Sequence, residues 1–359
     1  NSALFYREKA GNRLLLLVKN IPSKYKIPEK TAFLSDDIFS YHAELIETAL
    51  PEGLKEIGNY TFYYSNLEKA GIPDTVEKIG NYAFYQTKIK EINIPASLKI
   101  LGKNALSTRR NPEGGRCLDK VYVDPENPRF FVEQGALYAR EKEGIALYLY
   151  FGKEESYYLP SYAAIIKEGA FAESSVEEVF LHREIIKIEK DAFIQCKELK
   201  RLIIELKDER VCSMITLFLP TLDMVYDDLN RYLNCIYYDG EGEVVDFEVY
   251  DSLFPIVRDW DEMIQVALSR LESPCSINPK GEEQYRRFID RNFKNIYKRV
   301  INWENSRGLE ILLEIKSLSK DQIETMLDYT RSRNSPKMIA FLLNYIKNNY
   351  ASVEEDYEL

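Results

Sequence analysis

Residues 72–106 read IPDTVEKIGNYAFYQTKIKEINIPASLKILGKNAL and contain one frame twice, I-P-x-x-[VL]-x-x-[IL]-G-x-x-A-[FL]. The proline of this frame recurs at regular intervals, at Pro28, Pro51, Pro73 and Pro95. The large apolar position keeps the same steps, at Phe39, Phe62, Phe84 and Leu106. The period set by these steps is too short for a pair of helices. It predicts a solenoid in which each coil has one strand, one turn and one compact return.

The strand of each coil is predicted just before its proline. Residues 91–94 (EINI) alternate between polar and apolar, the period of a half-buried strand. Proline then ends the strand, because it has no N–H to donate to the next strand. After an interruption the frame resumes at Pro160 and Phe171, and His182 occupies the proline position of the following coil. We therefore interpret His182 as a surface turn residue.

Several longer stretches resemble the BspA-type leucine-rich repeats. They read LKEIGNYTFYYSNLEKAGIP, VEKIGNYAFYQTKIKEINIP and IIKIEKDAFIQCKELKRLII. Residues 118–140 resemble the non-repeating insert of that family, and residues 3–28 parallel residues 136–160 as a second copy of the insert's end. The resemblance covers about residues 3–205, although the proline is missing at His182 and near Ile204. It implies a leucine-rich-repeat solenoid that acts as a binding or adhesion surface of bacteria.

Outward residues of successive strands form columns on the concave wall of a leucine-rich solenoid. The alternation predicts one column of Lys24, Glu47, Lys69, Glu91, Lys120, Ser156, Glu178 and Arg201. It predicts a second column of Lys26, Ala49, Gly71, Asn93, Tyr122, Tyr158, Phe180 and Ile203. The candidate partner-binding residues are the three aromatics with the charges beside them: Tyr122, Tyr158, Phe180, Lys120, Glu178 and Arg201.

Exposed aromatic rings flanked by charge suit the recognition of a protein, a peptide or a sugar, because rings bury a large area at low entropic cost. Two other interpretations of the columns stay open. In the first, the helical domain or a loop of the insert packs over the aromatic residues. In the second, the alternating Lys and Glu residues of the charged column only support the sheet and keep the wall soluble.

A helical period replaces the repeat frame after Lys207. PTLDMVYDDLNRYL and DWDEMIQVALSRL carry helical apolar stripes, whereas YYDGEGEVVDFEVYD is either a hairpin or a loop. Residues 305–313 and 334–342 align with each other, which indicates short helix pairs similar to degenerate ankyrin or other helical repeats. Ser319 with Gln322 predicts a capping box, and Ser335 with Pro336 predicts a helix start. This array either binds proteins or caps the solenoid.

The sequence thus predicts an α+β repeat protein with two domains. Residues 1–207 form a leucine-rich-repeat solenoid with about 22-residue coils and a non-repeating insert at about 107–138. Residues 208–350 form an all-α domain of helical hairpins, and residues 351–359 form an acidic, mobile tail.

Composition narrows the classes of partner. A net charge of -10 argues against nucleic acid, which needs a basic footprint. The longest apolar run, Leu14–Val18, is too short to span a membrane. The five cysteines form no C-x-x-C pair and are interpreted as buried or free thiols, and with only two histidines we expect no metal and no cofactor. The absence of a signal segment slightly favours the cytoplasm, whereas a trimmed N-terminus would fit the cell surface.

The sequence contains no phosphate loop, dinucleotide fingerprint, G-x-S-x-G elbow or H-E-x-x-H helix. We therefore predict a non-enzymatic bacterial protein-interaction scaffold. One alternative is a cell-surface adhesin that binds host protein or carbohydrate. Another is a glycan-processing enzyme, which would need two carboxylates facing each other across a groove. In a third, the solenoid only spaces the domains of a longer chain.

Overall fold

The computed structural model describes residues 3–8, 11–17, 21–112, 115–205, 214–219, 235–236, 245–274 and 277–350. The chain divides into two compact units, residues 1–215 with 224–250 and residues 216–223 with 251–359. The predicted boundary after Lys207 and the predicted tail at 351–359 fall outside the described residues.

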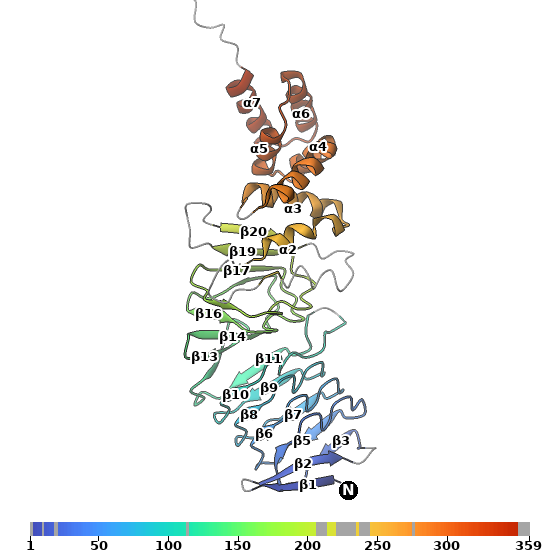
Figure 1. The fold of residues 1–359 in the computed structure, drawn as a ribbon, viewed down its shortest axis with the longest axis vertical. Coiled ribbons are helices and arrows are strands. Elements are labelled where there is room, and N and C mark those ends of the chain that lie inside the picture. The colour runs from blue at the N-terminus through green and yellow to red at the C-terminus, as the bar shows by residue number, and fades with distance from the viewer. Residues whose placement is uncertain are drawn as a thin grey trace, which may run out of the picture. The chain divides into compact units, whose positions relative to one another are not determined.

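The first unit is a solenoid whose coils stack one on the next (Figure 1). One wall, here called the column wall, contains the predicted strands and one further strand at residues 214–218, in the part of the chain that was predicted to be all-α. They are β3 (Lys24–Lys26), β5 (Glu47–Ala49), β7 (Lys69–Gly71), β9 (Glu91–Ile94), β11 (Lys120–Val123), β15 (Ser156–Tyr158), β17 (Glu178–Leu181), β19 (Arg201–Glu205) and β20 (Met214–Phe218). They form three sheets in the orders β3-β5-β7, β11-β9 and β15-β17-β19-β20. The repeat period therefore places one strand per coil on this wall.

A second wall also consists of strands, which the one-strand prediction did not include. Its elements are β1 (Ala3–Glu8), β2 (Gly11–Leu17), β4 (Thr31–Leu34), β6 (Glu56–Ile57), β8 (Lys78–Ile79), β10 (Ile100–Leu101), β12 (Phe130–Glu133), β13 (Ala136–Arg140), β14 (Ile145–Tyr150), β16 (Ala163–Ile166) and β18 (Lys187–Ile188). Several of these strands contain only two residues, which is too few to show an alternation of polar and apolar residues in the sequence.

The predicted second copy of the insert's end is confirmed in the folded chain. β1 and β2 form an antiparallel hairpin that continues into parallel β4, and β13 and β14 do the same before β16. Both copies have a register shift just after the hairpin, where Asn12 pairs with Thr31 but Arg13 with Phe33, and Ile145 pairs with Ala163 but Ala146 with Ile165. The solenoid thus contains the same starting motif twice.

Rows of phenylalanine fill the interior between the two walls. Phe39, Phe62 and Phe84 are fully buried and stack with ring centroids 5.1 and 5.2 Å apart. Phe171 and Phe193 repeat the arrangement at 4.9 Å. Each ring is covered by the ring one coil away, so a single coil cannot bury its own apolar side.

A ladder of polar side chains connects the coils at the Gly-Asn positions. Asn59 Oδ1 accepts a hydrogen bond from the backbone N–H of Asn81 at 2.8 Å, and Asn81 Oδ1 accepts one from Lys103 at 2.9 Å. A Cβ on Gly80 would lie 2.6 Å from the backbone nitrogen of Asn59, so the glycine is needed for this close approach. The Gly-Asn pairs therefore set the contact between successive coils.

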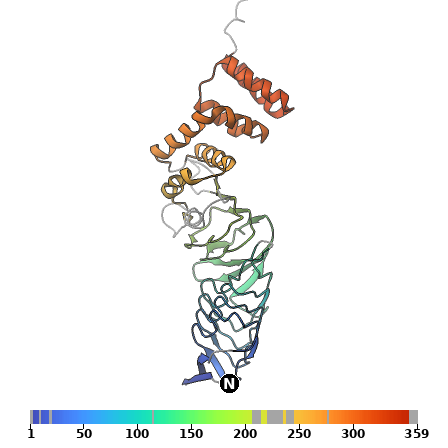
Figure 2. The same ribbon diagram turned by 90° about the vertical axis from the view of Figure 1, so that its right-hand side faces the viewer.

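The second unit contains helices and no strand among its residues 251–274 and 277–350 (Figure 2). Elements from this part of the chain are α2 (Phe247–Ser252), η1 (Phe254–Ile256), α3 (Trp260–Glu272), α4 (Pro279–Asn302), α5 (Ser306–Ile315), α6 (Lys320–Ser332) and α7 (Pro336–Tyr350). The predicted helix at 260–271 and the capping box of Ser319 with Gln322 are confirmed.

Two predictions for this region concern residues that lie partly or wholly outside the described ranges. The stripe PTLDMVYDDLNRYL, at residues 220–233, is not among the described residues. The acidic stretch 237–251 is described from Val245 onward. Val245 forms an antiparallel bridge with Ile236, which fits the hairpin alternative, and helix α2 begins two residues later at Phe247. The predicted alignment of 305–313 with 334–342 pairs α5 with α7, and its equivalent residues Leu309 and Met338 are both fully buried.

A buried ion pair lies in the core of the second unit. The guanidinium of Arg270 donates two hydrogen bonds to Asp251, at 2.8 and 3.1 Å, and the two side chains are 1% and 2% exposed. Tyr285 donates a further hydrogen bond to Asp251 at 2.7 Å. Such a pair is stable only when its remaining polar atoms are satisfied, so it fixes the mutual positions of α3 and α4.

Replacing Phe62 by alanine should lower the free energy of unfolding of the solenoid by about 3–5 kcal/mol, because the cavity removes a contact with both neighbouring rings. Phe62→Leu keeps most of the volume and should cost about 1.5 kcal/mol or less. Urea unfolding followed by circular dichroism measures both values. A loss below about 1 kcal/mol for the alanine variant would contradict the role of the stacked row.

Candidate functional site

The two predicted columns of the column wall are in register. Lys24 pairs with Glu47 and Glu47 with Lys69, and Lys120 pairs with Glu91. Parallel pairing continues in the third sheet, from Ser156 through Glu178 to Arg201 and from Tyr158 through Phe180 to Ile203. Side chains of one column therefore lie on neighbouring coils.

Tyr158 and Phe180 form the best-defined aromatic pair on this wall. Their rings stack with centroids 4.1 Å apart and planes 8° from parallel, and Tyr158 is 62% exposed. Beside them Glu178 forms an ion pair with Arg201 and accepts a hydrogen bond from Ser156. The pair with its charged neighbours is a preorganised aromatic surface, here called the aromatic pair site.

Tyr122 and Lys120 lie on a different sheet from the aromatic pair site. Tyr122 is 51% exposed on β11, which pairs with β9, and Lys120 forms an ion pair with Glu91 at 2.9 Å. The hairpin of the insert interrupts the pairing before β15. The three aromatic residues therefore occupy the same position of their strands, but they do not lie in one continuous sheet. Tyr158 and Phe180 contact each other directly, whereas Tyr122 lies on the separate β11-β9 sheet.

Ile203 was expected to extend the exposed column, and this prediction was wrong. Ile203 is 7% exposed, and its neighbours Leu202 and Ile204 are buried as well. Alternation assigns one face of a strand to the exterior, and it fails where a strand is covered on both faces. The exposed part of the second column thus ends at Phe180.

A second aromatic surface escaped the sequence reasoning. This tyrosine cluster lies on the return turns and consists of Tyr41, Tyr60, Tyr63, Tyr64, Tyr82 and Tyr85. Tyr60 stacks on Tyr82 at 5.2 Å and Tyr63 on Tyr85 at 5.4 Å. The repeated N-Y-x-F-Y of the frame could have predicted this cluster, because tyrosines at the same frame position in successive coils come within stacking distance.

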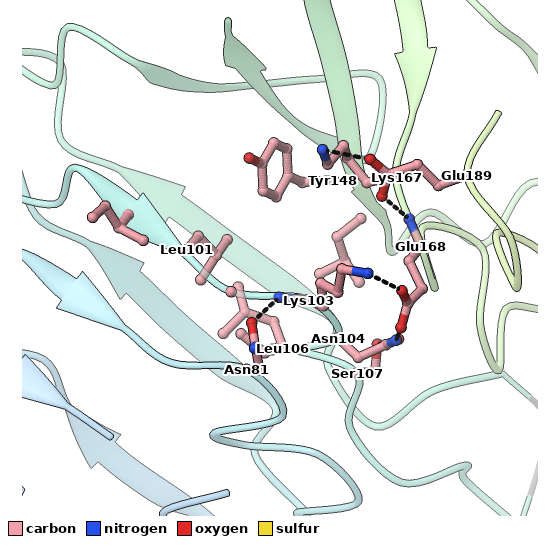
Figure 3. Close-up of a pocket in the computed structure, with 14 residues that line it drawn as sticks. Asn81, Leu101, Lys103, Asn104, Leu106, Ser107, Tyr148, Lys167, Glu168 and Glu189 are labelled. Atoms are coloured by element: carbon pink, nitrogen blue, oxygen red, sulfur yellow. Dashed lines mark hydrogen bonds and ion pairs between the residues drawn. The ribbon is translucent and has the colours of Figure 1, made fainter. Parts of the chain in front are cut away.

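A pocket of about 240 Å³ lies where the two parts of the second wall meet (Figure 3). Glu168 is one of the residues that line it, and its carboxylate accepts hydrogen bonds from Tyr82 at 2.8 Å, Lys103 at 2.7 Å and Asn104 at 3.3 Å. Gly169 beside it has φ of 70°, and a Cβ there would overlap Asn104 Oδ1. Residues far apart in the sequence are thus held together around this pocket, which is here called the seam.

The charges of the seam neutralise one another. Lys103 pairs with Glu168, and Lys167 pairs with Glu189 at 2.8 Å (Figure 3). Burial, together with the hydrogen bond to Glu168, raises the pKa of Tyr82 to about 12. Each charged residue that lines the pocket therefore has an opposite charge beside it, and the seam joins the two parts of the solenoid rather than presenting a free charge to a ligand.

The repeat frame, the stacked coils and the duplicated hairpin fit a known repeat type. Residues 19–112 and 148–213 match the model of the BspA type leucine rich repeat region, in 6 copies. In these two stretches the coils are BspA-type leucine-rich repeats. No protein with a curated description matches the chain. Among the described residues, no helix combines the length and the apolar character needed to cross a bilayer.

Solved structures similar to this BspA-type region come from bacteria. A leucine-rich cell surface protein of Faecalibacterium prausnitzii A2-165 is 16% identical over 56% of this chain and 76% of that chain, with a TM-score of 0.39. The pneumococcal vaccine antigen PcpA is 23% identical over 50% of each chain, with a TM-score of 0.43. A leucine-rich repeat protein of Eubacterium ventriosum ATCC 27560 is 20% identical over 53% of this chain and 56% of that chain, with a TM-score of 0.42.

The cysteines of the BspA-type region provide a test of its interior. Cys196 is fully buried and lies 3.1 Å from Ser174 Oγ, and burial raises the pKa of its thiol to about 11. Burial also raises the pKa of the Cys117 thiol. Cys212 and Cys275 lie outside the described residues.

We expect iodoacetamide at about pH 8 to leave Cys196 unmodified in the folded protein, because the thiolate is both scarce and inaccessible there. In urea the same residue should react fully, since an exposed thiol has a pKa of about 8.5. Mass spectrometry of the digested protein measures both. Rapid labelling of Cys196 in the native state would show that the coil is open at this point.

The Glu168→Gln variant should lower the free energy of unfolding by about 1–3 kcal/mol, because three donors lose a carboxylate that is only 14% exposed. Glu47→Gln is the matched control. Its partner Lys24 is 77% exposed, so solvent screens the pair and the change should cost clearly less than Glu168→Gln. Urea unfolding of both variants compares the two sites, and equal losses would argue against a special role of the seam.

Proposed function

We propose that this protein is a non-enzymatic bacterial protein-interaction scaffold that binds its partner at the aromatic pair site. The observation that carries the proposal is the stacked pair of exposed Tyr158 and half-buried Phe180 beside the Glu178–Arg201 ion pair. Large rings in fixed positions give up little conformational entropy on binding, which makes them strong anchors for a protein partner.

The surrounding structure supports an anchor at this point. Parallel pairing on both sides of β17 sets the ring positions, and the second ring covers one face of the first, so neither needs to reorganise on contact. Arg201 offers a planar guanidinium next to the rings, the residue type enriched with tyrosine at interface centres. Tyr122 with Lys120 would extend the contact along the column wall.

A cell-surface adhesin that binds carbohydrate is the second candidate. Aromatic faces also stack on the apolar faces of sugars, and the exposed outer ring of Tyr158 would serve that purpose. The two candidates differ in what the site should retain, a protein in one case and a glycan in the other.

The proposal is tested first by quantitative capture of partners from lysate and envelope fractions of a bacterial source. Tyr158→Ala should lose the specific protein partner, whereas Tyr6→Ala, which removes an exposed tyrosine from the second wall, should retain it. With the purified partner, calorimetry should show a dissociation constant at least about tenfold higher for Tyr158→Ala.

Three outcomes distinguish the alternatives. Equal capture by the native protein and Tyr158→Ala would refute the aromatic pair site as the anchor. Retention of a glycan in place of a protein would favour the adhesin. Turnover of a retained glycan, measured as released reducing sugar, would overturn the non-enzymatic part of the proposal.

A further inference from the structure

Helix α4 carries an excess of positive charge in a chain whose net charge is -10. Between Pro279 and Asn302 it contains seven basic and three acidic residues, a local balance of +4. One stripe of the helix lines a groove of about 390 Å³ together with η1. The groove residues are Phe254, Pro255, Lys280, Glu283, Gln284, Arg287, Phe288, Arg291 and Asn292. This surface is called the α4 groove.

Aromatic rings form the floor of the α4 groove. Phe288 is half-buried and meets Phe254 edge-on, with ring centroids 5.4 Å apart. It also meets Trp260 edge-on at 5.4 Å. The floor is therefore a rigid apolar surface whose rings are already packed against one another, suited to receive one apolar side chain rather than a series of stacked bases.

The rim of the groove has basic groups that lack an opposite charge. Within residues 245–274 and 277–350, Lys280 and Arg291 have no acidic partner at ion-pair distance, and both are exposed. Arg287 is held by Glu283 at 2.5 Å. The side-chain nitrogen of Gln284 is buried and has no hydrogen-bond partner among the described residues. In this part of the chain the groove thus offers two uncompensated cations and one amide donor.

We propose that the α4 groove binds a short acidic peptide segment that carries one apolar anchor side chain. The apolar residue would contact Phe288, its neighbouring carboxylates would pair with Lys280 and Arg291, and the amide of Gln284 would donate to a peptide carbonyl. The distance from Lys280 to Arg291 along the helix axis is about 16 Å, which about five residues of extended peptide span.

Two features favour a peptide over a nucleic acid. Glu283 lies at the groove and would repel a continuous row of phosphates, whereas a peptide can place a neutral residue there. The overall charge of -10 also repels long polyanions, while a short peptide with separate carboxylates meets mainly the local field of α4.

The experiment uses the full chain and fluorescence anisotropy with the labelled synthetic peptide GEEDFEEDSG at low salt. Its amide counterpart, with Gln and Asn at the acidic positions, should bind at least about tenfold more weakly, and so should the variant with Ala in place of Phe. The double variant Lys280→Glu/Arg291→Glu should lose at least about tenfold in affinity for the acidic peptide.

Lys294→Glu/Lys320→Glu is the matched control, because it makes the same change in net charge on exposed lysines outside the groove. It should alter the affinity by less than about threefold. Gln284→Leu, which keeps the volume and removes the amide, should lower the affinity by about three- to tenfold while the unfolding midpoint stays unchanged.

Three results would overturn the proposal. The first is no binding of the acidic peptide at millimolar protein. The second is an equal loss of affinity in both charge-reversed variants, which would indicate only long-range attraction. The third is displacement of the peptide by an oligothymidine of equal charge with no dependence on the apolar residue, which would mark the groove as a nucleic-acid or general polyanion surface.

Discussion

The fold of the solenoid depends on contacts between residues one coil apart. Each phenylalanine of the buried row is covered by the phenylalanine of the next coil, and the asparagines of the polar ladder accept hydrogen bonds from the next coil. Neither interaction exists within a single coil. The hydrophobic effect therefore acts on the stack as a whole, and a coil gains stability only through its neighbours.

The same spacing determines what the surface can present. Adjacent parallel strands place equal frame positions side by side, so aromatic positions become stacked pairs and charged positions become ion pairs. Tyr158 with Phe180 and Glu178 with Arg201 are two results of this one rule. Recognition residues on such a wall are rigid because the stack that supports the core also supports them.

Much of the first unit could be predicted, because the repeat frame reports directly on contacts between neighbouring coils. The column register and the duplicated hairpin followed from it. The burial of Ile203 did not, since alternation cannot show that a strand is covered on both faces. The seam at Glu168 was not predicted either, because the insert separates its coil in sequence from the coils of Tyr82 and Lys103. In the second unit, weak helical periodicity gave the helices but no indication of the groove beside α4.

The distribution of aromatic residues also gives the protein two separate optical signals. Both tryptophans, Trp260 and Trp303, belong to the second unit, whereas the tyrosine cluster belongs to the first. Light at the red edge of the absorption band excites tryptophan without tyrosine, so its emission follows the helices alone. Near-ultraviolet dichroism adds the stacked phenols of the coils, so a change in it that the tryptophan emission does not share reports on the first unit. The natural sequence therefore allows the unfolding of each unit to be observed in the intact chain without an added label.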